Sequence, residues 1–350
     1  MSVRRGLIAG LLITSAAARA GETPQVEPYK FLREQLQFSS SDLANLEKGR
    51  IVVKLPKTAE KREVAAFAIT RLDVSSDFFI ERVRDIAKFK KSANVLQIAK
   101  FSSPPRLEDL ADLTLDEADI DSLKKCRLKS CELKMSAASI DRLRKEVDWS
   151  APNYRDQVNR LLRVMLLEHV QAYLKGGNAA LGKYEDKSYA LEIEDEVRAL
   201  LKSASYMYGY MPELQRYLEE FPMARPKSSA HVEDFVYWSK EDFGLKPVIT
   251  LTHVTIYGRS PGKTSDVIVA SKGIYATHYL EGSLGLTAFI RSQQPNLSRS
   301  YLIYTNRSRT DALRGLFAGL KRSMIGGHVR SGAEKNMEMV KQKLEAEYLE

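Results

Sequence analysis

The chain has 350 residues and a formal net charge of +9, with 54 Lys and Arg against 45 Asp and Glu. This length can bury a large core and allows one elaborated domain or two. The basic residues are spread without an Arg/Lys block, so nucleic acid is excluded as the expected partner. A mild basic excess in an exported protein points to an anionic envelope surface, with a merely solubilising surface charge as the alternative.

The first twenty residues have the pattern of a secretory signal. Arg4 and Arg5 precede a short apolar run, and the small residues Ala18 and Ala20 form a cleavage site. We therefore predict cleavage after Ala20; a retained N-terminal anchor is the alternative. No later segment reaches the roughly 18 apolar residues that a spanning helix needs. The sequence thus predicts a soluble periplasmic or secreted protein without a transmembrane segment after signal removal.

The chain has two cysteines, Cys126 and Cys131. In an exported protein such a close pair favours a disulfide. The pair must then enclose a turn, because residues with this spacing on one helix have α-carbons too far apart for a bridge. Metal binding and redox activity are the weaker alternatives, since no histidine lies nearby and the spacing is not that of a redox motif. We predict no metal and no cofactor.

After a leader at 21–49 that ends in a short helix, strands and one helical segment alternate. The segment 75–91 is predicted to be helical, because apolar residues recur at spacings of four and three after two serines that can cap it. Strand patterns occur at 50–56, 62–74 and 94–102.

A predicted all-helical insertion occupies residues 105–234. Short helices are expected on either side of the cysteine turn, and one or two more toward its end. Between them, residues 151–177 carry a long helical stripe that Gly176 terminates. Strands return at 246–258, 265–280 and 299–309. The chain then ends in helices at 311–325 and 332–350, the last with an amphipathic stripe.

Without the insertion, this order of elements resembles the helix-grip fold of START-like lipid-transfer and ligand-binding proteins. The resemblance covers about residues 50–104 and 240–346. It implies an α+β fold in which a curved antiparallel sheet grips a long C-terminal helix, with an apolar ligand cavity between them. The expected divisions are a signal peptide (1–20), a leader with a short helix (21–49), a START-like domain (50–104 and 235–350) and the insertion (105–234).

Two short motifs carry little weight. In "YGRSPGKTS" the glycines Gly258 and Gly262 enclose three residues where a phosphate-binding loop needs four, and the stretch lies between two strands. We therefore predict a hairpin loop there. Ser122 and Lys125 match the Ser-x-x-Lys spacing of some serine hydrolases, but no companion motif accompanies them.

His253 and His278 lie on apolar faces of their predicted strands. If those strands pair, both imidazoles could point toward one interior, where a carboxylate such as Glu281 would permit metal binding or acid-base chemistry. A histidine on an apolar face is more often a hydrogen-bonded core residue. Tyr275 and Tyr304 belong to a group of tyrosines that suit either the lining of a ligand pocket or an ordinary core.

Arg307, Arg309 and Asp311 follow the apolar strand "YLIYTN". Asp311 is favoured as the cap of a helix that begins at Ala312, and an Arg-Asp pair is also possible. Alternatively, the two arginines bind the carboxylate or phosphate of a ligand at a pocket mouth.

The sequence favours an exported protein that binds an apolar or lipid-like ligand without catalysis. An envelope hydrolase that uses the two histidines is one alternative, and a structural or interaction protein whose insertion docks a partner is another. The candidate ligand-binding residues are His253, Tyr275, His278, Tyr304, Arg307 and Arg309.

Overall fold

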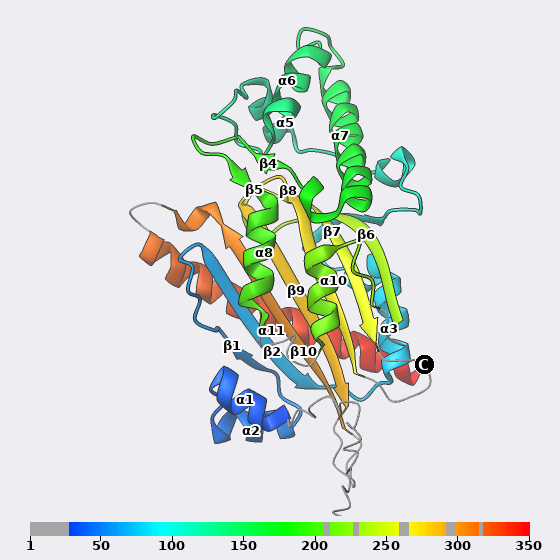
Figure 1. Ribbon diagram of the computed structural model, residues 1–350, viewed down its shortest axis with the longest axis vertical. Coiled ribbons are helices and arrows are strands. Elements are labelled where there is room, and N and C mark those ends of the chain that lie inside the picture. Colours follow the sequence, from blue (N-terminus) through cyan, green and yellow to red (C-terminus); the bar gives the residue numbers. More distant parts are fainter. Residues whose placement is uncertain (1–27, 206–210, 227–230, 259–265, 292–298, 315–317) are drawn as a thin grey trace, which may run out of the picture.

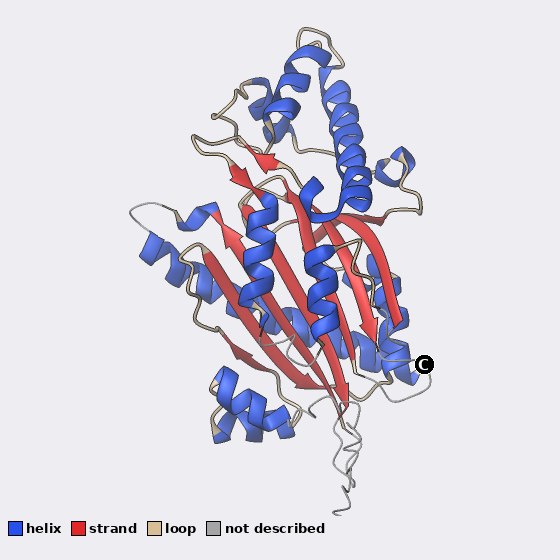
Figure 2. Cartoon of the chain, in the orientation of Figure 1, coloured by secondary structure: helices blue, strands red, loops and turns tan. Residues whose placement is uncertain are grey.

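The computed structural model describes residues 28–205, 211–226, 231–258, 266–291, 299–314 and 318–350. Figure 2 shows an α+β molecule with one large sheet and helices on both sides of it. Neighbouring strands are antiparallel, in the order β1-β2-β10-β9-β8-β7-β6-β3 (Figure 1). The strands are β1 (Val52–Lys54), β2 (Glu63–Arg71), β3 (Val95–Lys100), β6 (His231–Glu241), β7 (Val248–Gly258), β8 (Val267–Ala276), β9 (Leu280–Arg291) and β10 (Ser300–Thr310).

Among the described residues, five α-helices lie outside the predicted insertion, and serine caps begin two of them. Ser39 accepts a hydrogen bond from the amide of Asp42, and Ser75 from the amide of Phe78, so each cap satisfies an amide of the first turn. These helices are α1 (Pro28–Leu36), α2 (Ser40–Glu47), α3 (Ser76–Arg84), α4 (Ile86–Lys90) and the long C-terminal α11 (Ala318–Leu349).

Between β3 and β6 lies the helical block, the segment from η1 to α10. It is mainly helical, as predicted, but it also carries the two-stranded sheet β4-β5. Its longest helix, α7, ends at Gly176, and Gly177 follows with a φ of +64°. Its elements are η1 (Leu107–Leu110), α5 (Glu117–Lys124), α6 (Ala137–Glu146), α7 (Tyr154–Gly176), η2 (Gly177–Ala180), β4 (Lys183–Tyr184), β5 (Leu191–Glu192), α8 (Ile193–Ser203) and α10 (Pro212–Glu220).

The helical block and α11 cover opposite faces of the large sheet. In Figure 1, α8 and α10 lie in front of the strands and α11 behind them. We call these two faces the block face and the α11 face. Successive residues of β10 alternate between them, with Ile303 in the core beneath the block and Leu302 in the core that includes α11. Near its start α11 contacts β1, β2 and the short η3 (Asp311–Leu313), and it then crosses behind the strands to α3 and α4 (Figure 1). There Glu347 pairs with Arg82, and Lys343 donates to the carbonyl of Lys88.

The predicted fold class is confirmed, but the two C-terminal helices expected at 311–325 and 332–350 are instead one helix, Ala318–Leu349. Other differences concern segment boundaries. The strand β6 begins at His231, before the expected boundary at residue 235. Residues 259–265, which include most of "YGRSPGKTS", lie outside the described residues. They connect β7 to β8, whose ends pair at Gly258 and Val267, so the stretch joins two antiparallel neighbours.

The predicted signal peptide, residues 1–20, lies outside the described residues. Within the described ranges, no helix combines the length and the apolar character that crossing a bilayer requires.

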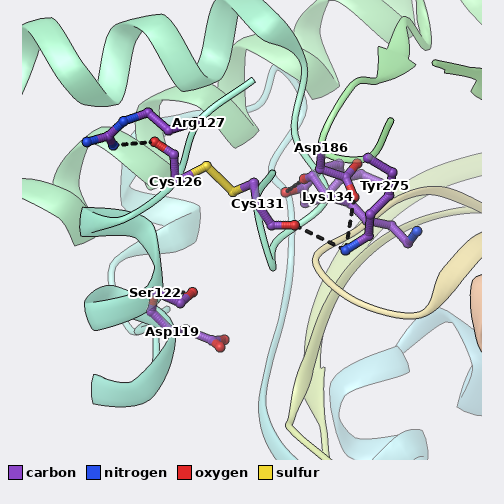
Figure 3. The surroundings of a disulfide bond; sticks show 9 residues. Asp119, Ser122, Cys126, Arg127, Cys131, Lys134, Asp186 and Tyr275 are labelled. Atoms are coloured by element: carbon purple, nitrogen blue, oxygen red, sulfur yellow. Dashed lines mark hydrogen bonds and ion pairs between the residues drawn. A yellow bond between two sulfur atoms is a disulfide. The ribbon is translucent and has the colours of Figure 1, made fainter. Parts of the chain in front are cut away.

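The predicted disulfide and its turn are confirmed. The Sγ atoms of Cys126 and Cys131 are 2.05 Å apart and their α-carbons 4.5 Å (Figure 3). Between them, Arg127 and Ser130 form an isolated antiparallel bridge. The amides of Lys129 and Cys131 donate to the carbonyls of Glu185 and Asp186, so the turn is held against the segment that follows β4.

Replacing both cysteines with alanine is expected to cost about 2 kcal/mol of unfolding free energy or less, because the disulfide closes only a small loop. Chemical denaturation of the oxidised protein and of the double variant measures this cost. A loss well above that value would mean that the bridge holds the helical block together by more than loop entropy.

Candidate functional site

The six candidate residues, all of them described, do not lie on one face of the sheet. His253, Tyr275, Arg307 and Arg309 lie on the block side, and so does His278 in the turn after β8. Tyr304 packs instead against the core that includes α11. The parity of β10 accounts for the split, because Tyr304 is offset by an odd number of residues from Arg307 and Arg309.

His253 is the centre of a buried hydrogen-bonded chain. Its Nδ1 accepts from the hydroxyl of Tyr173 at 2.7 Å, and its Nε2 donates to Oδ1 of Asp234 at 3.0 Å. Asp234 also accepts from Thr255 and Tyr217. Burial lowers the pKa of His253, so the ring is neutral at pH 7. These contacts join β6 and β7 to the helical block, and the imidazole is 0% exposed.

Asp234 keeps its charge inside this chain of contacts. Burial acts to raise the pKa of Asp234, but the hydrogen bonds from His253, Tyr217 and Thr255 outweigh burial and lower that pKa. Asp234, held by three donors, fixes the orientation of the His253 ring, and a histidine that acts as a general base needs such a partner. However, His253 is fully buried, so no substrate can reach its ring.

Lys272 pairs with His253 across β7 and β8 and is 1% exposed. Its Nζ donates to Oδ1 of Asn178 at 2.7 Å and lies 5.1 and 5.3 Å from the ring centroids of Tyr173 and Phe221. Burial lowers the pKa of Lys272 to about 7. Lys272 is not among the residues predicted from the sequence, although a lysine between Ala270 and Ile274 on an apolar strand is the signal that could have revealed it.

His278 and Tyr275 hold the end of β8 against the helical block. The Nε2 of His278 donates to Oδ2 of Asp119 on α5 at 3.0 Å, and the hydroxyl of Tyr275 donates to the carbonyl of Lys134 at 2.9 Å. The carboxylate suggested as a third group, Glu281, pairs with Arg314 at 2.9 Å. In the described part of the chain, no group of three or more His, Cys, Asp and Glu side chains could hold a metal ion.

Arg307 and Arg309 bind carboxylates of the protein itself. Arg307 donates to Glu63 of β2 at 2.5 Å, and Arg309 donates to Glu196 of α8 at 2.9 Å. Arg62 bridges Glu196 and Glu281. Glu63 and Glu281 are each 1% exposed, so these charges lie almost wholly inside the molecule. We call this set the arginine–glutamate cluster; its members are Arg62, Arg307, Arg309, Arg314, Glu63, Glu196 and Glu281.

The predicted capping role of Asp311 is wrong. Thr310 is the cap of η3, because its Oγ1 accepts from the amide of Ala312. Asp311 lies inside the first turn and pairs with the buried Lys134 at 2.8 Å. The suggested pairing of Asp311 with the arginines is also wrong, because the carboxylate of Asp311 pairs with Lys134 of the helical block. Lys134 is distant in sequence, so local spacing cannot reveal it as the partner.

On the α11 face, the middle of the sheet is built of small polar residues that are partly exposed. Gly273 pairs with Ser283, and Gly285 with Ser271 and Asn306. A β-carbon at Gly273 would lie 2.2 Å from the Ser283 hydroxyl, so a side chain there would have to displace that hydroxyl. A glycine within a strand also allows another group to approach the backbone closely. The partly exposed residues of this central patch are Ser271, Gly273, Ser283, Thr287, Asn306 and Ser308.

Tyr304 and a lysine–glutamate pair lie on this same face. Lys90 of α4 donates to the Tyr237 hydroxyl at 3.2 Å and to Glu241 at 2.7 Å. Burial acts to lower the pKa of Lys90, but Tyr237 and Glu241 outweigh it and raise that pKa. Burial also raises the pKa of Tyr304, so its hydroxyl keeps its proton at neutral pH and can donate.

An open groove of about 980 Å³ follows a flank of α11. Ile51 and Met339 supply its apolar lining, and Arg50, Lys335 and Glu338 are among its charged residues. None of the six candidate residues lines this groove.

Comparison with protein-family models, curated protein sequences and solved structures found no match to this chain.

Proposed function

We propose that this protein binds an amphipathic, lipid-like ligand, without catalysis, between the central patch of the α11 face and α11. The main observation in support of this proposal is that the two faces of the same strands differ in exposure. In β10, Tyr304, Asn306 and Ser308 are partly exposed, whereas the alternating Thr305 and Arg307 are buried. One face of the sheet is therefore closed by the helical block, and the middle of the other remains accessible.

The side chains on the α11 face suit a ligand with one polar end and one apolar end. Hydroxyl and amide groups of the central patch can donate and accept hydrogen bonds, and Ser308 already donates to Oδ1 of Asn306 at 2.8 Å. Apolar residues of the same face, such as Val254, Val269 and Phe289, belong to the core that includes α11. A few polar groups set among apolar walls are typical of sites for small apolar molecules.

The order of elements also supports the proposal, since it is the order on which the resemblance to START-like proteins rests. The histidine-based hydrolase gains no such support, because His253 and His278 are 0% and 4% exposed.

Native mass spectrometry of the purified protein, followed by solvent extraction, is expected to reveal a bound amphipathic molecule. Asn306→Phe fills the central patch, so it is expected to lower the uptake of a fluorescent fatty acid at least about tenfold, as a steric block of about 1.4 kcal/mol would. Asn336→Phe makes the same substitution on an exposed position of α11 and is expected to leave uptake unchanged. Thermal unfolding checks that both variants fold.

Two outcomes would contradict this location. Equal uptake by the wild type and Asn306→Phe, with both folded, would exclude the central patch. Loss of uptake in Met339→Asp, with Asn306→Phe unaffected, would place the ligand in the open groove along α11 instead. Absence of uptake by the wild type, together with a protein free of extractable ligand, would reject lipid binding altogether.

A further inference from the structure

The disulfide turn displays a group of cations that the fold leaves without carboxylate partners. Lys124, Lys125, Arg127 and Lys129 are exposed. Within the described ranges none of the four forms an ion pair: Lys124 contacts the carbonyl of Trp149 and the ring of Tyr154, and Arg127 donates to the carbonyl of Cys126. This differs from the sheet, where buried arginines are matched to glutamates. The turn therefore retains free positive charge.

Nearby carboxylates do not neutralise this charge. Glu132 pairs with Lys246, and Glu185 accepts from the amide of Ala137. Asp186 is 2% exposed and lies near Lys187. On α5, Asp121 and Glu117 are exposed as well, and Glu117 lies 4.0 Å from Arg155. These carboxylates cannot balance four cations.

Large apolar side chains are exposed at the same end of the molecule. Leu128, at the tip of the disulfide turn, is 50% exposed. The ion pair between Lys246 and Glu132 brings the turn between β6 and β7 beside the disulfide turn. That second turn exposes Phe243 by 58% and Leu245 by 64%. Apolar tips and unpaired cations thus lie on adjoining turns.

Both turns are fixed in place. The disulfide closes the first turn, and Figure 3 shows Arg127 beside Cys126, on the opposite side of the disulfide from Lys134, Asp186 and Tyr275. In the second turn, the amide of Gly244 donates to Asp242 at 2.7 Å and the amide of Lys246 to the Tyr279 hydroxyl at 3.2 Å. Rigid turns lose little conformational entropy when they bind a surface.

We propose that this end of the molecule, which we call the basic tip, docks on an anionic lipid surface. Its members are Lys124, Lys125, Arg127, Leu128, Lys129, Phe243 and Leu245. The cations complement phosphate headgroups, and the leucines and phenylalanine enter the boundary between headgroups and acyl chains. An acidic protein would satisfy the charges but would leave three exposed apolar side chains without a matching environment, so the membrane is the better match.

Co-sedimentation with phosphatidylglycerol–phosphatidylcholine vesicles tests the basic tip. The wild type is expected to bind these vesicles, to bind phosphatidylcholine vesicles far less, and to dissociate as salt is added. Each lysine near an anionic surface contributes roughly fivefold in affinity, so Lys125→Glu/Lys129→Glu is expected to weaken binding at least about 30-fold. Lys175→Glu/Lys202→Glu changes the net charge equally at exposed positions outside the tip and is expected to bind as the wild type does.

The apolar part is tested separately with Leu128→Ser/Phe243→Ser, which keeps every cation and is expected to weaken vesicle binding as well. If Lys125→Glu/Lys129→Glu and the Lys175→Glu/Lys202→Glu control lost the same vesicle affinity, net charge alone would explain the binding, and the proposal would be overturned. Wild-type binding to poly-glutamate but not to vesicles would overturn it in favour of an acidic protein. Asn306→Phe is expected to bind vesicles normally, so the tip and the ligand site fail independently.

Discussion

Replacing Glu63 with glutamine is expected to lower the free energy of unfolding by about 3–5 kcal/mol, the typical cost of removing one partner from a buried ion pair. Glu63 is 1% exposed and accepts from Arg307, while Nε of Arg309 lies 3.5 Å from its second oxygen. Glutamine keeps the shape of the side chain but removes the charge. The guanidinium groups of Arg307 and Arg309 are at most 9% exposed. Without the charge of Glu63, their positive charge would be less well neutralised in a region with little water.

Urea denaturation at neutral pH measures this loss, and Glu194→Gln is the matched control. Glu194 lies two residues before the buried Glu196 on the same helix, but its pair with Arg198 is at the surface, where the two side chains are 36% and 61% exposed. Surface pairs contribute about 0–1 kcal/mol, so the control is expected to unfold close to the wild type. Similar, small losses in both variants would contradict a structural role for the arginine–glutamate cluster.

The cluster also bears on how the helical block is attached. Arg309 of β10 and Arg62 both reach Glu196 of α8, so α8 is linked electrostatically to the sheet as well as by packing. The charges of Arg309 and Arg62 therefore link the sheet to the helical block. The sequence also suggested that Arg307 and Arg309 bind the head group of a ligand; the structure pairs them with Glu63 and Glu196.

The order and type of the elements could be predicted because they depend on local patterns. The spacing of Phe79, Val83 and Ile86 predicts one helical segment between β2 and β3, which the structure divides at Asp85 into α3 and α4. Gly176 ends α7 as expected. The disulfide turn followed from the predicted export of the chain together with the spacing of Cys126 and Cys131. Each of these inferences needs only local sequence patterns and the geometry of one element.

The candidate site could not be predicted equally well, because parity assigns residues to two faces without saying what covers each face. His253 lies on the face shared with Ile249 and Leu251, as its spacing indicates. The structure adds that this face is closed by the helical block. Partners distant in sequence, such as Lys134 for Asp311 and Glu63 for Arg307, also decide roles that no local pattern reveals.

Stability is expected to rise between pH 7 and 9 because of Lys272. The pKa of this lysine is about 7 in the folded protein and has an ordinary value of 10.5. Between these values the unfolded chain binds one proton more than the folded chain, so the free energy of unfolding increases with pH. The slope from this group reaches about 1.4 kcal/mol per pH unit. Below pH 7 both states are protonated, and the cost of the buried charge is then fully present.

Lys272→Met is expected to remove this pH dependence and to raise the free energy of unfolding at pH 7 and below by about 1–4 kcal/mol, as apolar replacements of buried charges often do. Methionine keeps most of the length and apolar character of the lysine side chain beneath Tyr173 and Phe221. It leaves Oδ1 of Asn178 without its lysine donor, which offsets about 1 kcal/mol of the gain. Urea denaturation at several pH values between 6 and 9 measures both effects.

Lys272 titrates in a different pH range from the ionisable groups around it. His253 has a lowered pKa and is already neutral at pH 7, and Tyr173 and Tyr217 have raised pKa values and titrate above pH 9. Lys175→Met, at an exposed position of α7, is expected to keep the slope of the wild type. Parallel pH profiles for the wild type and Lys272→Met would show that Lys272 keeps an ordinary pKa in the folded protein. Water or a rearranged carboxylate would then have to solvate its ammonium group beneath the helical block.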